Sequence, residues 1–441
     1  MLGRTILANS LLLVSLLVGC EGHGPSARAS TPDATPVDAR PPGPDAHPPR
    51  LLSLADGEAE IAKARVVKLA ALRFPEGRAI WSAPVRDPDA MTDGPLALSV
   101  AGDVLVVQTW DMTLAAFRLD GRVLWSAEAQ PTAWGVALGP DHLAASFLES
   151  STRQHALTVF DEMTGRVVWS EPDFYLNPVH AAVSPSSGWI ADVRFEQDVL
   201  VYYFRGDVDP PGPAPGLIRA LDARTGRPLW SRRTGNDDLQ LAVAPGLVLV
   251  RAAGAPAGPE SELPPGLVAL RLRDGSIAWS IDESVETRYQ DPIVCGERVF
   301  WNHGVRDPEG RLLWRNPALL AAGGKARSCD GRLALAYDAG SSADHICVVD
   351  LADGSVRYVV EGPAVNDAYV TIQAGLLLVR GDLDSHNEPY ALRVLDAETG
   401  APLWQHTFRA GLASEAVATG DGVFVVDDRF SPARFARNPR P

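Results

Sequence analysis

The sequence predicts an all-β fold, an eight-bladed β-propeller of four-stranded antiparallel blades that spans residues 53–430. Three observations predict it. A motif of an acidic residue, a glycine and, four positions after the glycine, an aromatic residue recurs eight times. Short strand-like segments fill the sequence between the copies, and we expect no amphipathic helix of useful length. Repeats of about 40–50 residues with four strands each are typical of propeller blades.

The motif is best formed where Asp222, Thr225 and Gly226 precede Trp230. An Asp side chain hydrogen-bonds to its own turn, and Gly adopts the positive φ that a bulged hairpin needs. The aromatic residue then lies on the outgoing strand, where its large ring can fill the gap to the next blade. We therefore interpret the copies as tryptophan docking motifs with a structural role. Their aromatic residues are Trp81, Trp125, Trp169, Trp230, Trp279, Trp314, Tyr358 and Trp404.

One repeat shows the order of strands within a blade. Leu96–Val100, Val104–Gln108, Leu114–Leu119 and Val123–Trp125 predict four strands joined by short turns. The segment from Asp291 to Trp314 is the weakest copy, because its third strand, around Gly304 and Val305, is short or missing. We expect this blade to be the smallest.

The two ends of the propeller predict how the ring closes. Before the first motif only Ala64–Phe74 is strand-like, so the first unit has two strands. After the last motif, Glu415–Ala418 and Val423–Asp427 give two more. Pairing the N- and C-terminal strands would complete the eighth blade and remove an exposed sheet edge. We expect residues 431–441 to be a flexible tail.

The N-terminus predicts export. The apolar run Ile6–Val18 is too short to span a bilayer, and it leads into Gly19 and Cys20 in a pattern that resembles the lipobox of bacterial lipoproteins. We therefore expect a signal peptide over residues 1–19, lipidation of Cys20 and a disordered, Pro-rich tether over residues 20–52. The alternative is an ordinary secretory signal with an incidental cysteine. The lipidated protein would be attached to the envelope, at the outer membrane, and face the periplasm or the cell surface.

The formal net charge of −15 bears on partners. An acidic surface disfavours nucleic acid and direct docking on anionic lipid. We expect no nucleic-acid partner, membrane contact through the lipid anchor alone, and a monomer.

The repeat resembles that of the pyrroloquinoline quinone (PQQ)-like propellers, which include the quinoprotein dehydrogenases and the BamB-type lipoproteins of outer-membrane β-barrel assembly. In the dehydrogenases, the resemblance implies a disulfide between adjacent cysteines, a stacking Trp and calcium ligands. After Cys20 this chain has Cys295, Cys329 and Cys347, and no two are adjacent. We therefore expect no catalytic residue and no cofactor. PQQ and calcium belong to the alternative, a periplasmic dehydrogenase.

The cysteines predict a structural link. Cys295 and Cys329 each precede the first turn of neighbouring blades, so a disulfide could join the two inner strands. Cys347 lies on a third strand, where a buried small residue is expected. No Cys/His spacing indicates a metal site.

Other polar clusters carry little signal. Trp301-Asn302-His303 is interpreted as structural, and the segment from Asp382 to Glu388 as a polar loop, because it lacks the Gly and the last Glu of a calcium loop. Asp87, Asp89, Asp237 and Asp238 are interpreted as solvated loop charge.

Loop lengths favour one face of the propeller as the binding face. The first-to-second and third-to-fourth strand turns are short, whereas every long insertion lies at the opposite end of the blades. Binding residues concentrate on such loops, although drift in loop length is the alternative. We expect a scaffold that binds a protein or an envelope polymer, with BamB-like assembly of outer-membrane proteins as one version. Residues for this face are Phe174, Tyr175, Asn177, His180, Tyr289, Asn366 and Tyr369.

Overall fold

The structure is a computed structural model. It describes residues 49–68, 79–82, 95–109, 113–128, 132–149, 154–171, 188–206, 216–234, 239–252, 261–282, 291–321, 325–337, 344–362, 369–381, 391–408, 416–420, 422–427 and 431–436. The chain divides into the units Met1–His47 and Pro48–Pro441, and all the described residues belong to the second. Among them, no helix has the length and apolarity needed to cross a membrane.

Seven blades are each formed by four consecutive antiparallel strands. The first three are β4 (Pro95–Ala101), β5 (Val104–Thr109), β6 (Thr113–Arg118) and β7 (Val123–Glu128); β8 (Thr132–Leu138), β9 (His142–Glu149), β10 (Gln154–Asp161) and β11 (Val167–Glu171); and β12 (Gly188–Glu196), β13 (Val199–Gly206), β14 (Gly216–Asp222) and β15 (Pro228–Thr234). The next two are β16 (Gln240–Ala244), β17 (Leu247–Ala252), β18 (Gly266–Arg271) and β19 (Ile277–Ile281); and β20 (Ile293–Cys295), β21 (Arg298–Trp301), β22 (Gly304–Arg306) and β23 (Leu312–Arg315). The last two are β24 (Lys325–Asp330), β25 (Leu333–Tyr337), β26 (Asp344–Asp350) and β27 (Val356–Gly362); and β28 (Tyr369–Gln373), β29 (Leu376–Gly381), β30 (Ala391–Asp396) and β31 (Pro402–Thr407).

The remaining sheet is composite. The N-terminal strand β3 (Ala79–Ser82) pairs with β34 (Ser431–Ala436), and β33 (Gly422–Asp427) and β32 (Ala416–Ala418) complete the sheet. The predicted closure by pairing N- and C-terminal strands is confirmed, because β3 pairs with β34. The predicted division into two strands from each end is wrong, because the C-terminal segment supplies three strands and the N-terminal segment one. The predicted flexible tail at 431–441 is wrong over residues 431–436, which form β34, and residues 437–441 lie outside the described residues. Seven contiguous blades and one composite sheet replace the predicted arrangement of eight.

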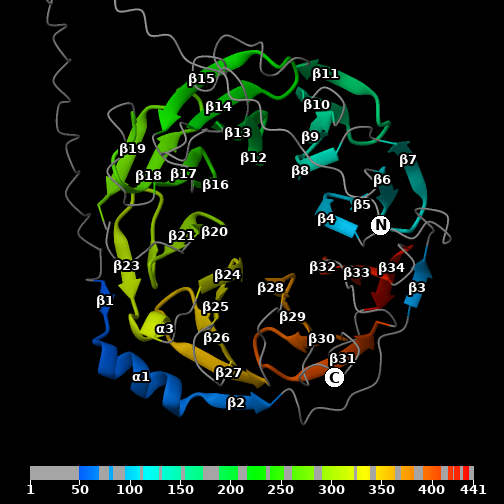
Figure 1. Ribbon diagram of the computed structural model, residues 1–441. Coiled ribbons are helices and arrows are strands. Elements are labelled where there is room, and N and C mark those ends of the chain that lie inside the picture. Colours follow the sequence, from blue (N-terminus) through cyan, green and yellow to red (C-terminus); the bar gives the residue numbers. More distant parts are fainter. Residues whose placement is uncertain are drawn as a thin grey trace, which may run out of the picture. The chain divides into compact units, whose positions relative to one another are not determined.

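The sheets follow one another around a ring (Figure 1). The first strand of each sheet contacts the first strand of the next, in the order β4, β8, β12, β16, β20, β24 and β28. The composite sheet then contacts β29 on one side and β4 on the other, which closes the ring. Strand β4 and its equivalents face the axis, and the strands that carry the docking aromatics form the rim. The predicted all-β propeller of four-stranded antiparallel blades is confirmed.

A strap precedes the first blade strand. We use this name for residues 50–68, which contain β1 (Arg50–Leu51), helix α1 (Leu54–Lys63) and β2 (Arg65–Lys68). Strand β1 adds in parallel to β23, and β2 adds in parallel to β27, so the strap crosses the rims of two neighbouring blades. The sequence analysis expected no useful helix, a blade strand over Ala64–Phe74 and a disordered tether up to residue 52. These three expectations are wrong over the described residues.

Packing and capping explain why the strap folds. Ser53 caps α1, since its Oγ accepts a hydrogen bond from the Asp56 N–H at 3.1 Å. Gly57 lies against Asn316 and Ala318, beside the short helix α3 (Ala318–Ala321), and a Cβ on Gly57 would come within 2.6 Å of the Ala318 Cβ. Val67 is only 5% exposed and joins the core cluster of Tyr358 and Val360. The strap is therefore part of the packed structure.

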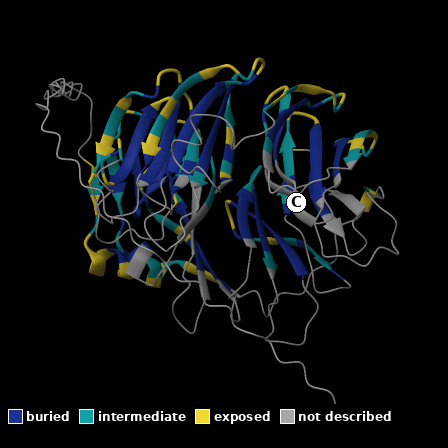
Figure 2. Cartoon of the chain, turned by 45° about the horizontal axis from the view of Figure 1, so that its top comes forward, coloured by how far each residue is buried: buried dark blue, intermediate teal, exposed yellow. Residues whose placement is uncertain are grey.

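The core lies between the sheets (Figure 2). Buried residues occupy the middle of the strands, and exposed ones occupy turns and the rim. One cluster joins Val104 and Val106 of one blade with Leu143 and Ala145 of the next. Each blade therefore buries its faces only against its neighbours, which is why a single repeat cannot fold alone.

Candidate functional site

The best-formed motif is a hydrogen-bonded turn. The Asp222 Oδ1 accepts from the Thr225 backbone N–H at 2.9 Å and from the Thr225 hydroxyl at 2.8 Å. The Thr225 hydrogen bond is the main reason that the pKa of Asp222 lies below its usual range. Strand β14 has a register shift at Ala220 and Leu221, where a bulge was expected. Asp161 with Thr164 and Asp396 with Thr399 repeat these contacts.

The aromatic residue of each motif packs on the turn of the next sheet. Trp169 lies over Gly226, where an added Cβ would sit 2.9 Å from the indole, and Gly226 has a φ of +69°. Glycine is therefore required twice, for the backbone conformation and for the close approach. The indole N–H also donates to a backbone carbonyl of that sheet, Ala223 in this case, at 2.7 Å. The other bonds are Trp81 to Leu119, Trp125 to Glu162, Trp230 to Leu272, Trp279 to Pro308, Trp314 to Leu351 and the Tyr358 hydroxyl to Ala397.

In these contacts the polar groups of the motif form hydrogen bonds within the protein itself. The Trp404 side chain is fully buried as well, at 0% exposed, although the first motif that it would face lies outside the described residues. The motif thus explains how sheets join, and it offers little for ligand chemistry.

The predicted partner-binding face lies almost entirely outside the described residues. This holds for Phe174, Tyr175, Asn177, His180, Tyr289 and Asn366. Tyr369 begins β28, and its backbone pairs with Arg380. The polar segment from Asp382 to Glu388, and Asp87, Asp89, Asp237 and Asp238, also lie outside. Cys20 belongs to the N-terminal unit, which is not described.

The other candidate side chains are buried within the structure. Asn302 and His303 form the two-residue turn between β21 and β22 with φ values of +49° and +53°, and both are buried. Burial, with the nearby positive charge of Arg315, lowers the pKa of His303 to about 4. Among the described residues, no three His, Cys, Asp or Glu side chains are grouped so that they could hold a metal ion.

A disulfide joins two inner strands. Cys295 at the end of β20 and Cys329 in β24 are linked with a Cα–Cα distance of 5.7 Å. Cys347 lies in β26, outside this link, and is 7% exposed. The disulfide therefore lies between the smallest blade and the next one.

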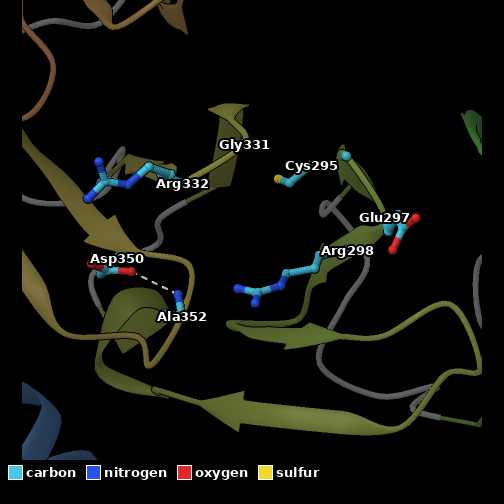
Figure 3. Close-up of a pocket in the computed structure, with 8 residues that line it drawn as sticks. Cys295, Glu297, Arg298, Gly331, Arg332, Asp350 and Ala352 are labelled. Atoms are coloured by element: carbon cyan, nitrogen blue, oxygen red, sulfur yellow. Dashed lines mark hydrogen bonds between the residues drawn. The ribbon is translucent and has the colours of Figure 1, made fainter.

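A pocket at this junction, which we call the seam pocket, has a volume of about 470 Å³ (Figure 3). One wall is the β20–β21 turn and the other consists of turns of the next blade. Arg298 extends between the two walls, and its Nη1 donates to the Leu351 carbonyl at 2.7 Å. The lining residues are Cys295, Gly296, Glu297, Arg298, Gly331, Arg332, Asp350 and Ala352.

Sequence reasoning missed Arg298. Six described hairpins between the first and second strands have two-residue turns, and in β21 the residue after the turn is Arg298, paired with Cys295. The other five carry Val104, Val199, Leu247, Leu333 and Leu376 at this position. An arginine in an aliphatic column of the repeat was the signal that could have identified the pocket.

A second pocket of about 310 Å³ lies on the inner strands, lined by residues of β4, β8, β12, β28 and β32. Its polar side chains include Arg194 and Gln373. Arg194 pairs with Asp192 at 3.2 Å, and the Gln373 Oε1 accepts from the Ala418 N–H at 2.9 Å. Both groups are already engaged, so this axial pocket is the weaker ligand site.

A scan against protein-family models matches one family, described as "Outer membrane protein assembly factor BamB", over residues 61–172 and 111–300, more than half of the chain. A search of curated proteins finds no match. Among solved structures, BamB from Moraxella catarrhalis is similar with a TM-score of 0.53 and 12% identity, covering 82% of this chain and 98% of that chain. A quinohemoprotein alcohol dehydrogenase from Comamonas testosteroni has the same TM-score and identity, covering 82% of this chain and 78% of that chain.

A third solved structure is similar to the same degree. Sqt1 from Saccharomyces cerevisiae has a TM-score of 0.53 and 10% identity, covering 82% of this chain and 100% of that chain. At these identities the structural likeness establishes the fold alone.

Proposed function

Because this chain belongs to the family described as outer membrane protein assembly factor BamB, we propose that it is a non-catalytic propeller that binds a protein partner at the cell envelope. The match of the family model over residues 61–300 carries the proposal. The specific version is participation in the assembly of outer-membrane proteins. The tight docking of the sheets supports a rigid scaffold, and the long insertions that the sequence predicts at one end of the blades would offer a surface to a partner.

The proposal includes a lipid anchor on Cys20. The apolar run followed by Gly19 and Cys20 supports export and lipidation, and the Pro-rich segment would hold the propeller at a distance from the membrane. Fractionation of cells that produce the full-length chain tests this part. The wild type should be recovered with the outer membrane and the Cys20→Ser variant in the soluble fraction, and equal distribution of the two would contradict it.

The alternative is a PQQ- and calcium-dependent dehydrogenase. The described residues do not fit that group. The paired cysteines join two different sheets instead of being adjacent, and the described residues contain no carboxylate cluster suited to calcium. The axial pocket has its arginine and glutamine engaged in protein contacts. We therefore derive no quinone chemistry.

One experiment separates the two functions. The full-length tagged chain is cross-linked in intact envelopes of its native host, purified, and its partners are identified, with the Cys20→Ser variant as the mislocalised control. Enrichment of outer-membrane assembly proteins by the wild type but not by the control supports the proposal. No such enrichment, together with tight PQQ binding and alcohol oxidation by the purified chain, would replace it with the dehydrogenase.

A further inference from the structure

We propose that the seam pocket is a binding site for a carboxylate group, held by Arg298 with support from Arg332. This inference goes beyond the proposed function and does not rest on it. The site is formed by the β20–β21 turn and two turns of the next blade, which meet at the junction of β20–β23 and β24–β27, at the end of the blades that has the short turns.

Arg298 is positioned to reach the next blade. In an antiparallel hairpin, paired residues point to the same face of the sheet. Arg298 pairs with Cys295, whose sulfur reaches the next blade, so the arginine side chain also projects toward that blade. At the equivalent positions, Val104, Val199 and Leu376 are at most 1% exposed and belong to clusters shared with the next sheet. An aliphatic residue fills the junction there, whereas at this junction a pocket of about 470 Å³ is present.

The positive charge of Arg298 has no acidic partner among the described residues. Arg298 is partly buried, and its one hydrogen bond goes to a neutral carbonyl, that of Leu351. Among the described residues, no carboxylate lies within ion-pair distance of its guanidinium. A desolvated cation is costly unless it is paired, so a site with this geometry favours an anion.

The arginines and the acidic residues of the pocket together favour a singly charged carboxylate. A guanidinium presents a planar fork of donors that fits the two oxygens of a carboxylate. Arg332 lines the other wall and forms an exposed ion pair with Glu398 at 3.6 Å. Glu297 and Asp350 also line the pocket, and Asp350 already pairs with Arg357. Their negative charge disfavours a dianion, so a singly charged carboxylate fits better than a phosphate.

The size of the pocket and its apolar surface limit the molecule that carries the carboxylate. The pocket is large enough for a small organic acid or for the last one or two residues of a polypeptide. Cys295, in the disulfide, and Ala352 supply apolar surface beside the two arginines. The carboxylate could therefore come from a free acid or from the C-terminus of a partner protein, and the chemistry of recognition is the same.

Calorimetric titration of the oxidised chain with three probes tests the proposal. The probes are butyrate, an N-acetylated tripeptide with a free C-terminus, and the same tripeptide as its C-terminal amide. We expect saturable binding of at least one carboxylate probe and none of the amide. Tighter binding of the peptide acid identifies a polypeptide terminus as the source, and tighter binding of butyrate identifies a free acid.

Four variants locate the site. Arg298→Gln should weaken binding roughly ten- to hundredfold, the effect of losing a charge-assisted hydrogen bond. Arg332→Gln should weaken it several-fold, and its exposed side chain makes unfolding of this variant unexpected. Arg298→Leu restores the aliphatic residue of the other hairpins, so it should abolish binding and keep or raise the melting temperature. Arg122→Gln, at an exposed turn of another blade, is the matched control and should bind like the wild type.

Three results would overturn the proposal of a carboxylate site. If neither acid binds saturably at about 10 mM, a weak-affinity limit for a functional site, the pocket is not a carboxylate site. If Arg298→Leu binds like the wild type, the site lies elsewhere. If Arg298→Leu loses stability and the wild type binds nothing, Arg298 has a structural role only. Each of these outcomes overturns the proposal without bearing on envelope cross-linking, which tests the proposed function separately.

Discussion

Two junctions of the ring join equivalent sheets by different means. Between β12–β15 and β16–β19, the strands of the first sheet are 7–9 residues long, and Val199 and Val201 pack with Leu270 and Leu272. Between β20–β23 and β24–β27, the strands of the first sheet have only 3 or 4 residues. A disulfide, the Arg298–Leu351 hydrogen bond and the strap link that sheet to its neighbour. We call these the regular junction and the reinforced junction.

The difference shows how a short blade is kept in the ring. Short strands form few ladder hydrogen bonds and bury little area, so their own sheet contributes little stability. The small blade instead buries Trp301 against the preceding sheet and Trp314 against the following one. Cross-links then hold it at the inner strands, and the strap holds it at the rim. We therefore predict that the stability of this blade depends on its neighbours more than that of the other blades does.

The largest expected effect comes from the docking aromatics. Trp314 is 1% exposed at the reinforced junction, so Trp314→Ala should cost about 3–5 kcal/mol of unfolding free energy. Trp230 at the regular junction is half-buried, and Trp230→Ala should cost about 1–3 kcal/mol. Chemical denaturation of both variants measures the two losses. A larger loss for Trp230→Ala would reverse the comparison.

Removal of the disulfide should have the next largest effect. The Cys295→Ser/Cys329→Ser variant opens a link that spans 34 residues, and it should lose about 2–4 kcal/mol. Reducing the wild type should lower its melting temperature to a similar extent, while reduction should leave the variant unchanged. If reduction lowers both melting temperatures equally, the link contributes nothing at this junction.

The strap gives a smaller effect whose sign is informative. Alanine normally stabilises a helix relative to glycine by about 1 kcal/mol. Gly57 nevertheless lies against Asn316 and Ala318, so Gly57→Ala should destabilise the protein by about 1–3 kcal/mol through overpacking. Glu58→Ala on the exposed side of α1 is the control and should be nearly neutral. A Gly57→Ala variant that is more stable than the wild type would mean that the strap is loosely docked.

The smallest expected effect depends on pH. Burial, with Asp141, Asp103 and Asp161 nearby, raises the pKa of Glu162 to about 7. Because the folded pKa lies above the ordinary value of 4.5, the stabilisation from the protonated carboxyl is complete below pH 4.5 and is lost as the pH rises through 7. Glu162→Gln should therefore raise the melting temperature relative to the wild type at pH 8 and change it little at pH 4.5. The same difference at both pH values would contradict the raised pKa.

The repeat made much of the fold predictable, because it fixes both a turn and a contact. Asp222, Thr225 and Gly226 specify the turn, and Trp230 needs a second sheet to bury its ring, so a ring of sheets follows from the sequence. Cys295 and Cys329 could be paired because both lie near the end of the first strand in successive blades, although Cys329 lies one residue further from its turn than Cys295. The short third strand at Gly304 and Val305 was also predicted, and the structure confirms it as β22.

The strap was not predictable from local pattern, because its strands add to rims that are more than 200 residues away in the sequence. One signal was nevertheless present. At five rims an exposed serine follows the Trp, whereas Arg315 and Val359 take that place on the two rims that the strap covers. These serines are Ser82, Ser126, Ser170, Ser231 and Ser280.

The predicted partner-binding residues differ from the docking residues because they do not recur from blade to blade. A motif residue is recognisable because the same contact recurs in every blade, whereas a binding residue occurs once and has no repeat to mark it. Arg298 illustrates the exception, because it breaks a column of aliphatic residues.

Native-state hydrogen exchange tests the reinforced junction most directly. Amide exchange is measured for Val299 and Phe300 in β21 and for Val201 and Tyr203 in β13, with the disulfide oxidised and then reduced. Dependence on cross-links predicts that reduction accelerates exchange in β21 and leaves β13 unchanged. Equal protection of β21 in both states, or equal acceleration of both strands, would show that the small blade does not depend on its link to the next sheet.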